Sequence, residues 1–268
     1  MLGIHTRVDP SIRPGDTVSL PVVIVGFVGS GSMAAAIARG WAGEFERMLF
    51  SDSGSGRAQT LAAELGGEVA SNAEIASQAD LVLLAVKPNK LEEVAPELAE
   101  AKEIVSVLAA TPLERLRAAL PGAEQVLRVM PNVGVEVRQG VLCVAGSVGA
   151  GARAKLELLG RVVELPEADF DAATAVMGCS PAYLALAVEA IAEAGAADGL
   201  DPDLSRELVV ETAAGTAELL RRHDPAAVRK AVASPGGSTE KGLEALDREG
   251  AREAFAAAVR ASLERMRG

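Results

Sequence analysis

The fold is decided by residues 22–34, which read VVIVGFVGSGSMA. The first four residues form a continuous apolar run, which is typical of a strand buried in a parallel sheet. Gly29, Gly31 and Ala34 follow with the spacing G-x-G-x-x-A, and a helix is predicted from Ser32. Gly29 permits the tight turn, Gly31 lets the backbone approach a pyrophosphate, and Ala34 lets the helix pack close to the strand. Because the start of a helix presents free N–H groups, this stretch predicts a dinucleotide-binding turn.

Short apolar strands alternate with helices from this stretch to Val144. Strands are predicted at 22–25, 48–50, 68–70, 81–86, 104–108, 126–130 and 141–144, and helices at 32–42, 57–65, 73–79, 91–99 and 112–120. This alternation predicts a parallel sheet that is covered by helices on both faces. The natural arrangement is a Rossmann-type doubly wound domain, to which we assign residues 21–166.

The pattern changes after Pro166, beyond which only helices are predicted. They are expected at 181–197, 203–222, 225–233, 239–247 and 252–267. The helix from Pro181 is apolar nearly all round and should be buried on every side, so we infer that a second subunit helps to cover it. We therefore expect an α/β protein with a C-terminal all-α dimerisation domain at 167–268. Residues 1–20 are expected to form a flexible N-terminal arm.

The composition argues against several classes of function. The 268 residues include 26 Lys and Arg against 37 Asp and Glu, so the formal net charge is −11, the wrong sign for binding nucleic acid or an anionic membrane. Cys143 and Cys179 do not form a CxxC motif, which predicts two reduced thiols in a cytoplasmic protein. His5 and His223 lack the spacing of metal ligands, so no metal site is expected.

Neither a signal peptide nor a membrane span is predicted. Residues 1–20 carry charges and no apolar run. The apolar stretch near Tyr183 to Val188 is interrupted by Glu189 and Glu193. The expected partners are therefore a small-molecule substrate and a second copy of the chain, without nucleic acid or membrane.

The cofactor candidates continue at the end of the second strand. Asp52 lies about twenty positions after the glycine turn, where an acidic residue bonds the adenosine ribose and favours NAD(H). Ser53, Ser55 and Arg57 could equally hold a 2′-phosphate and favour NADP(H). The pattern thus predicts NADP(H) or NAD(H), with Asp52 and Ser53 near the ribose.

Two further candidates follow strand ends, where parallel sheets bind ligands. Lys87, in the run Ala85-Val86-Lys87-Pro88, would contact the cofactor or a carboxylate, or else simply cap the end of the sheet. Asn132, after Met130-Pro131, would orient a carboxamide or a substrate, or else form a turn.

A second glycine-rich loop lies in the helical half, where residues 233–239 read ASPGGST before a helix. Its N–H groups could bind a substrate carboxylate, with the Thr239 hydroxyl at the helix start. The alternative is an ordinary N-cap and turn.

In their order along the chain, these motifs resemble those of pyrroline-5-carboxylate reductases. The resemblance runs from Pro21 to about Arg267, and its most specific part is Ser234 to Thr239 followed by Gly242, Leu243 and Leu246. The other matching runs are Gly29 to Ala34, Ala85 to Pro88, Met130 to Asn132 and Ser180 to Tyr183.

The resemblance implies an oxidoreductase that reduces 1-pyrroline-5-carboxylate to L-proline with NAD(P)H, the last step of proline biosynthesis. It also implies a homodimer in which each active site uses both subunits, often assembled into rings of dimers. The cofactor-lining residues it implies are Gly29, Ser30, Gly31, Ser32, Met33, Asn72, Ala85, Val86, Lys87, Pro88 and Ala110. The substrate residues it implies are Ser234, Gly236, Gly237, Ser238, Thr239 and, as a weaker candidate, Glu167, and we add Asn132 from its position.

The expected mechanism is hydride transfer to the carbon of a cyclic imine. We expect Thr239 to hydrogen-bond the ring nitrogen as the catalytic residue, while the amides of Gly236 to Thr239 bind the carboxylate. A cyclic iminium is already electrophilic, so the main contribution of the protein is to hold donor and acceptor together.

The chain departs from the family pattern near the presumed pocket. It has Met177-Gly178-Cys179 in place of Ser-Gly-Ser, Val133-Gly134 in place of Thr-Pro, and Glu240 in place of an apolar residue. A reductase of a related cyclic imine and a non-catalytic nucleotide-binding regulator therefore remain as alternatives. A β-hydroxyacid dehydrogenase type would need a lysine on the long helix, and none occurs between Lys155 and Lys230.

Overall fold

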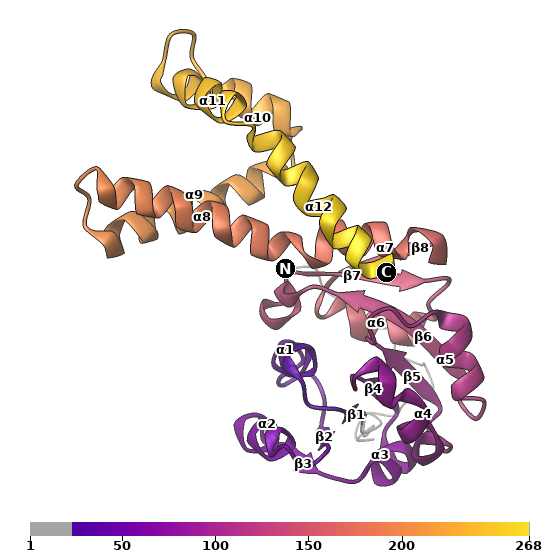
Figure 1. Ribbon diagram of the computed structural model, residues 1–268. Coiled ribbons are helices and arrows are strands. Elements are labelled where there is room, and N and C mark those ends of the chain that lie inside the picture. The colour runs from indigo at the N-terminus through magenta and orange to yellow at the C-terminus, as the bar shows by residue number, and fades with distance from the viewer. Residues whose placement is uncertain (1–22, 268) are drawn as a thin grey trace, which may run out of the picture.

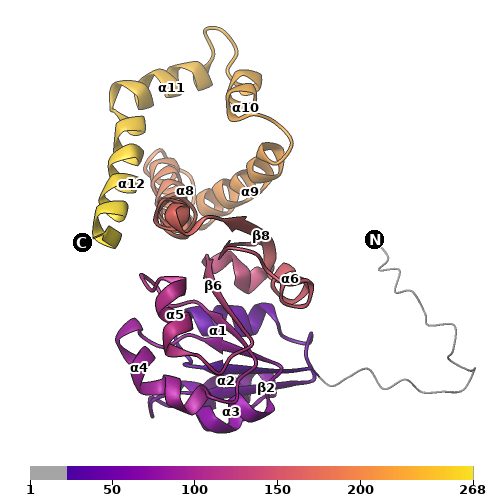
Figure 2. The same ribbon diagram turned by 90° about the vertical axis from the view of Figure 1, so that its right-hand side faces the viewer.

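The computed structural model describes residues 23–267, so the arm expected at 1–20 lies outside the described part. Figure 1 shows an α/β domain from which a set of long helices projects, and Figure 2 shows the same two parts after a quarter turn. The expected fold class, a doubly wound sheet followed by a helical domain, is confirmed.

An eight-stranded sheet with the order β3-β2-β1-β4-β5-β6-β7-β8 forms the centre of the first domain. Its strands are β1 (Ile24–Val28), β2 (Arg47–Ser51), β3 (Glu68–Val69), β4 (Leu81–Leu84), β5 (Glu103–Ser106), β6 (Gln125–Pro131), β7 (Gly140–Ala145) and β8 (Gly160–Leu165). The order reverses between β1 and β4, and a doubly wound sheet opens a ligand crevice at that point.

The expectation of a wholly parallel sheet is wrong at one edge. β7 runs antiparallel to β6, whereas β8 is again parallel to β7. The link between β6 and β7 holds only the short turn η3 (Val133–Val137), and a parallel crossover needs about a dozen residues or more. The half-exposed strand β8 and the helix α6 (Ala150–Glu157) before it were not predicted, because their mixed polar pattern shows no apolar run.

Helices cover both faces of the sheet and bury two apolar clusters. The helices are α1 (Ser32–Gly40), α2 (Arg57–Leu65), α3 (Asn72–Gln78), α4 (Leu91–Val94) and α5 (Leu113–Ala119), with the 3₁₀ turns η1 (Pro88–Lys90) and η2 (Ala95–Leu98). On the face of α1, α2 and α6, Phe27 stacks on Phe50 at 4.8 Å and meets the edge of Trp41 at 6.1 Å between ring centroids. The Trp41 indole N–H donates to the carbonyl of Lys155 in α6 at 2.9 Å, so this ring group is fully packed.

From Glu167 the chain is helical to the end of the described part. The elements are η4 (Glu167–Asp169), α7 (Phe170–Ala173), the π-helical turn η5 (Thr174–Gly178), α8 (Ser180–Ala197), α9 (Pro202–Leu220), α10 (Pro225–Val232), α11 (Ser238–Arg248) and α12 (Ala251–Arg267). Aspartates cap two of these helices: Asp201 accepts from the amides of Asp203 and Leu204, and Asp224 from that of Ala226. The boundary between residues 166 and 167 stays a prediction.

The projecting helices bury very little within one chain. Among the described residues from α8 to Arg267, only Ala192 and Ser205 are buried, while Leu184, Leu186 and Ile191 of α8 are 60% exposed or more. In Figure 2, the helices α8, α9, α10, α11 and α12 follow one another around a ring. The burial on every side that was expected for α8 is therefore absent from the single chain.

The helical run Glu167–Ala197 is also long and apolar enough to cross a membrane, by length and composition alone. The expectation that no segment could do so is therefore wrong in that respect, because Glu189 and Glu193 do not interrupt the run enough. Such a helix still needs some apolar cover, and a second protein surface provides it as well as lipid does.

Candidate cofactor and substrate site

A cleft of about 620 Å³ opens at the carboxyl ends of β1, β2 and β4, where the strand order reverses. It brings together most of the predicted cofactor residues, namely Gly29, Ser30, Gly31, Asp52, Ser53, Asn72, Ala85, Val86 and Lys87. Ser55 and Arg57, the candidates for a 2′-phosphate, line it as well.

The glycine turn has the geometry that a pyrophosphate requires. Gly29 has φ +97°, and a Cβ there would lie 2.7 Å from the carbonyl oxygen of Ala85, so no other residue fits. A Cβ on Gly31 would meet no atom within 4 Å, which leaves open space above the start of α1. No side chain caps α1, so its first N–H groups are available to an anion. This part of the cleft fits a dinucleotide.

The turn is anchored to β2 through one carbonyl. The amide of Gly29 and the hydroxyl of Ser30 both donate to Ser51 O, at 3.2 Å and 2.9 Å. The Ser51 hydroxyl donates to Asn72 Oδ1 at 2.5 Å and ties the start of α3 to the same point. Asn72 is positioned by a capping box between Ser71 and Glu74, which fixes that helix end.

Some predicted cofactor residues lie elsewhere. Ser32 and Met33 line a neighbouring cleft of about 630 Å³ that shares Ser30, Gly31 and Arg57 with the first. Pro88 begins η1 beyond the cleft wall, and Ala110 is exposed after β5. Ala110 has φ +50°, an unusual conformation for a residue with a side chain.

Sequence analysis missed other residues of the cleft wall. Lys90, Glu93, Val94 and Glu97 line it from η1, α4 and η2, and Lys90 pairs with Glu93 at 2.5 Å. Their spacing of three and four residues, directly after the β4 strand end, was the signal that could have found them. Ser51, Ala70 and Ser71 complete the lining.

Asp52 does not point freely into the cleft. Its Oδ1 accepts from the amides of Gly54 and Ser55 at 2.7 Å and 3.1 Å, and its Oδ2 from the Ser55 hydroxyl and the Ala58 amide at 2.8 Å and 2.9 Å. These bonds, above all the one from the Ala58 N–H, lower the pKa of Asp52 to about 2. The carboxylate is therefore ionised and bonded within its own loop.

Asn132 and Glu167, both predicted substrate residues, lie outside the cofactor cleft. Asn132 donates to Met177 O and accepts from the Val141 amide, both at 3.2 Å, which joins the end of β6 to β7 and to η5. Glu167 pairs with Arg128 of β6 and accepts from the Leu113 amide at 3.2 Å. Both side chains thus hold the junction between the sheet and the helices.

The second glycine-rich loop joins α10 to α11, and two of its amides already have partners. The Gly236 amide donates to Glu240 Oε2 at 2.7 Å, and the Gly237 amide to Ser234 O at 2.9 Å. The expectation that all four amides from Gly236 to Thr239 bind a carboxylate is therefore too broad for this chain. The first turn of α11, where Gly237 contributes no capping side chain, offers the remaining donors at Ser238 and Thr239.

The two candidate sites do not meet within one chain. Figure 1 shows α10 and α11 at the end of the helical part that lies farthest from β1 and α1. No residue of the 234–239 loop lines either cleft beside the glycine turn. The single chain therefore does not combine them in one site.

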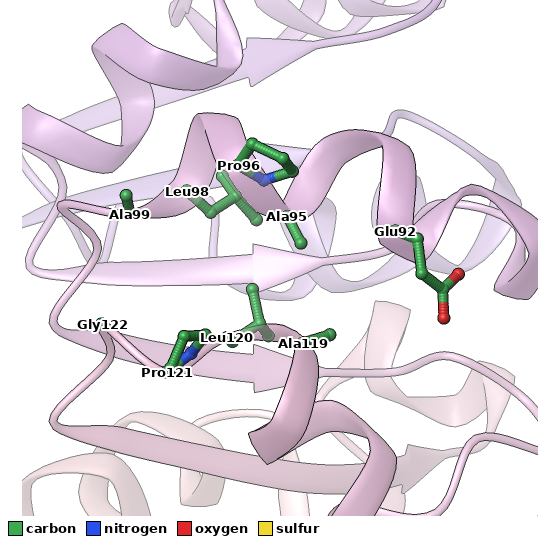
Figure 3. Close-up of a pocket in the computed structure, with 9 residues that line it drawn as sticks. All are labelled: Glu92, Ala95, Pro96, Leu98, Ala99, Ala119, Leu120, Pro121 and Gly122. Carbon is green, nitrogen blue, oxygen red and sulfur yellow. The ribbon is translucent and has the colours of Figure 1, made fainter.

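Another cleft carries no comparable chemistry. It has a volume of about 300 Å³, lies near the amino ends of β5 and β6, and is lined mainly by apolar residues such as Ala95, Leu98 and Leu120 (Figure 3). Figure 3 shows Glu92 at its margin, apart from the other lining residues. Among residues 23–267, moreover, no group of three or more His, Cys, Asp or Glu side chains is placed to hold a metal ion.

Family models match both parts of the chain. Residues 24–110 match the family described as "NADP oxidoreductase coenzyme F420-dependent", and residues 167–268 match "Pyrroline-5-carboxylate reductase dimerisation".

Curated relatives and a solved structure extend over more of the chain. It is 37% identical over 205 residues to a pyrroline-5-carboxylate reductase of Synechocystis, covering 72% of this chain and 76% of the relative. It is 36% identical over 259 residues to pyrroline-5-carboxylate reductase 3 of Bos taurus, covering 91% and 84%. A pyrroline carboxylate reductase structure from Plasmodium falciparum with NADP bound superimposes with a TM-score of 0.77 at 27% identity, covering 91% and 97%.

Proposed function

The chain belongs to the pyrroline-5-carboxylate reductase family, and we propose that it reduces 1-pyrroline-5-carboxylate to L-proline with NAD(P)H. The observation that carries this proposal is the match to curated reductases over 259 residues, which spans the glycine turn and the helical domain together. The cleft at the switch point of the sheet supports it, because it holds the backbone features that a dinucleotide requires.

The cofactor contributes a hydride to the reaction when it is bound. Gly29, Gly31 and the start of α1 bind its pyrophosphate, as a helix N-terminus binds other phosphates. Lys87, on the wall of the cleft after β4, adds a positive charge in a chain whose formal net charge is −11. The protein thus supplies orientation and local charge, while the redox chemistry belongs to the cofactor.

The substrate is held by the start of α11. The amides of Ser238 and Thr239 bind its carboxylate, and the Thr239 hydroxyl hydrogen-bonds the ring nitrogen. The reduction would add a hydride to the imine carbon and a proton from solvent to the nitrogen, which together give the secondary amine of proline. The proton is taken up first, so that the iminium is the form that accepts the hydride. No strong acid is needed, because a protonated imine is already electrophilic and the chief requirement is close alignment of donor and acceptor.

Two copies of the chain form each active site in this proposal. The cofactor cleft of one copy receives the α10–α11 loop of the other, which accounts for their separation within a single chain. The family model over residues 167–268, described as a dimerisation domain, supports self-association. A ring of dimers is proposed as the larger assembly. We also propose a cytoplasmic location, without membrane or nucleic-acid partners, which the two unbonded thiols and the acidic charge favour.

Glu240 favours one alternative, a related cyclic imine as the substrate. Its carboxylate accepts a hydrogen bond from the Gly236 amide, next to the amides that we assign to the substrate carboxylate. Two negative charges so close to each other repel. A substrate with its carboxylate placed differently, or without one, would avoid this repulsion. The intact Thr239 and its loop argue against a purely regulatory protein.

The proposal is tested by following nicotinamide absorbance with 1-pyrroline-5-carboxylate and each cofactor. Thr239→Ala should lower kcat/KM at least about tenfold, in line with the loss of one well-placed hydrogen bond, and leave cofactor affinity unchanged. Thr212→Ala, an exposed threonine of α9, is the matched control and should behave as the wild type.

Each other outcome has a distinct meaning. Wild-type kinetics in Thr239→Ala would remove this residue from the mechanism. Turnover only with imines of other ring size, or without a carboxylate, would support the alternative substrate. A flat trace with every imine and both cofactors would leave a nucleotide-binding regulator.

A further inference from the structure

We propose that Glu240 is a specificity-determining residue of the substrate loop: its charge weakens the binding of cyclic imines that carry a carboxylate and leaves the binding of uncharged cyclic imines unchanged. The inference rests on the proposed function, because it concerns the loop that we assign to the substrate. It adds to that function the residue that sets the balance between charged and uncharged substrates.

The loop before α11 begins with a tight turn that does not use one of its own amides. The Gly237 amide donates to the Ser234 carbonyl at 2.9 Å, and Pro235 and Gly236 lie between these two residues. Gly236 has φ +74°, a left-handed value that glycine adopts readily at the third position of such a turn. The Gly236 amide takes no part in closing the turn and donates to Glu240 Oε2 at 2.7 Å.

Glu240 thereby places a negative charge at the start of α11. It lies in the first turn of the helix, next in sequence to Thr239, and its carboxylate reaches back to the residue before the N-cap, Gly237. A carboxylate is favourable at this end of a helix, because the first N–H groups carry partial positive charge. The proposed function assigns the Ser238 and Thr239 amides of the same turn to the substrate, so both carboxylates would lie at one helix end.

No cation among the described residues neutralises Glu240. None of the ion pairs within residues 23–267 includes it, and the neighbouring Lys241 is bound to Glu244 at 2.8 Å. Arg229 and Lys230, in the last turn of α10, are exposed and do not pair with it either. A substrate carboxylate at the start of α11 therefore meets an unneutralised negative charge, whereas an uncharged imine does not.

Glu240 is also half-buried, which strengthens this effect. Its charge is screened less by water and salt than that of a fully exposed side chain. The hydrogen bond from Gly236 fixes the carboxylate beside the loop instead of letting it turn away into solvent. The repulsion is thus built into the loop, and we expect it to change substrate affinity rather than the hydride step.

Two substitutions separate the charge of Glu240 from its hydrogen bond. Glu240→Gln keeps an acceptor for the Gly236 amide and removes the charge, whereas Glu240→Leu removes both. If the charge sets specificity, Glu240→Gln should lower the KM for 1-pyrroline-5-carboxylate about three- to tenfold at saturating cofactor and leave kcat within about twofold. The KM for 1-pyrroline, the same ring without the carboxylate, should stay within about twofold. If Glu240 only tethers the loop, Glu240→Gln should match the wild type and Glu240→Leu alone should lose activity with both imines.

Ionic strength provides a readout that a tether would not move. The difference in KM for 1-pyrroline-5-carboxylate between wild type and Glu240→Gln should shrink as the ionic strength rises from about 0.05 M to about 0.5 M, because salt screens the repulsion. Glu253→Gln, at an exposed carboxylate in the first turn of α12, is the matched control and should change the KM for neither imine.

The failure of this inference differs from the failure of the proposed function. If the wild type reduces neither imine with NADPH or NADH, the proposed function itself is wrong. If it reduces 1-pyrroline-5-carboxylate and Glu240→Gln leaves the KM unchanged, raises it, or lowers it equally for both imines, the function stands and the role of Glu240 in specificity is overturned. If 1-pyrroline is reduced by no variant, the change in KM for the carboxylate and its loss at high salt decide the matter.

Discussion

The α/β half and the helical half of this chain differ in where their apolar side chains go. In the first, Phe27, Phe50 and Trp41 are fully buried between a sheet and its helices. In the second, Leu184, Leu186 and similar residues stay exposed in the single chain. The α/β half therefore carries its own core, whereas the helical half depends on a surface that another molecule must supply.

The difference originates in the helices themselves. α1 buries Ala34, Ala36, Ile37, Ala38 and Gly40 within the α/β half, so elements of the same chain supply its cover. α8 has leucine, valine and isoleucine on several faces and can be satisfied only by neighbours around it. One polypeptide thus combines a domain that buries its own apolar side chains with one that leaves them exposed.

The largest effect is expected from charges placed on the exposed face of α8. Leu184→Asp combined with Ile191→Asp, seven residues apart and thus on one side of the helix, should abolish self-association and with it almost all reductase activity. Sedimentation would show monomers, while cofactor binding to the α/β half persists. Val69→Asp, at an apolar residue of β3 that is 49% exposed, should leave association unchanged. If the α8 variant still self-associated, the exposed face of α8 would not be the surface that a second copy covers.

A matched pair of phenylalanine substitutions should show how the two halves differ in stability. Phe27→Ala removes a ring with 0% exposure that stacks on Phe50, and should cost about 3 to 5 kcal/mol of unfolding free energy. Phe255→Ala, in α12 and 50% exposed, should cost under about 1 kcal/mol in a monomeric background but weaken the dimer. Urea denaturation at low and high protein concentration separates the two effects. Equal losses at both positions would contradict the distinction.

The junction between the halves should show an intermediate effect. Arg128 is nearly buried, stacks over the Phe170 ring at 4.4 Å, and pairs with the partly exposed Glu167. Glu167→Gln leaves the buried guanidinium without a carboxylate and should cost about 1 to 3 kcal/mol. Glu92→Gln, which breaks the exposed pair with Arg115, should cost less than about 1 kcal/mol. A thermal melt of each variant tests whether Glu167→Gln loses more stability than Glu92→Gln. A similar loss of stability in both variants would contradict this prediction.

The smallest effect concerns acid. The pKa of Asp52 is lowered from 3.8 to about 2 in the folded protein, so its bonds stabilise the fold above pH 4 and are lost as the pH falls from about 4 to about 2. After allowance for solvent screening the contribution is about 1 kcal/mol. The gap in urea midpoint between wild type and Asp52→Asn should therefore shrink from pH 5 to pH 3, whereas Asp203→Asn, on an exposed carboxylate, should show no such gap. If the difference in urea midpoint between wild type and Asp52→Asn did not change with pH, the Asp52 carboxylate would not stabilise the fold through its ionised form.

Sequence reasoning succeeded where local pattern and structure agree. The spacing of Gly29, Gly31 and Ala34 predicted the turn that the structure shows, because its backbone requirements are encoded within a few residues. The alternation of strands and helices predicted the doubly wound sheet. The reversal of β7 was missed because an apolar run does not encode strand direction, and β8 because a half-exposed strand lacks such a run.

The candidate site was predictable in part. Most cofactor residues converge on one cleft because carboxyl ends of parallel strands share an edge. The role of Asp52 could not be predicted from the sequence, because its hydrogen bonds depend on the left-handed turns at Gly54 and Gly56. Glu167 was assigned to the substrate, yet its partner Arg128 lies 39 residues away in sequence, a pairing that only the folded chain reveals.

The placement of Trp41 has a practical consequence for spectroscopy. It is the sole tryptophan and lies in the α/β core, whereas the sole tyrosine, Tyr183, lies in α8 with its hydroxyl 2.5 Å from that of Ser262 in α12. Each half of the molecule thus carries one intrinsic fluorophore. Emission excited in the tryptophan band reports the melting of the sheet alone, and tyrosine emission reports the helices, so the two halves can be observed separately in one unlabelled sample.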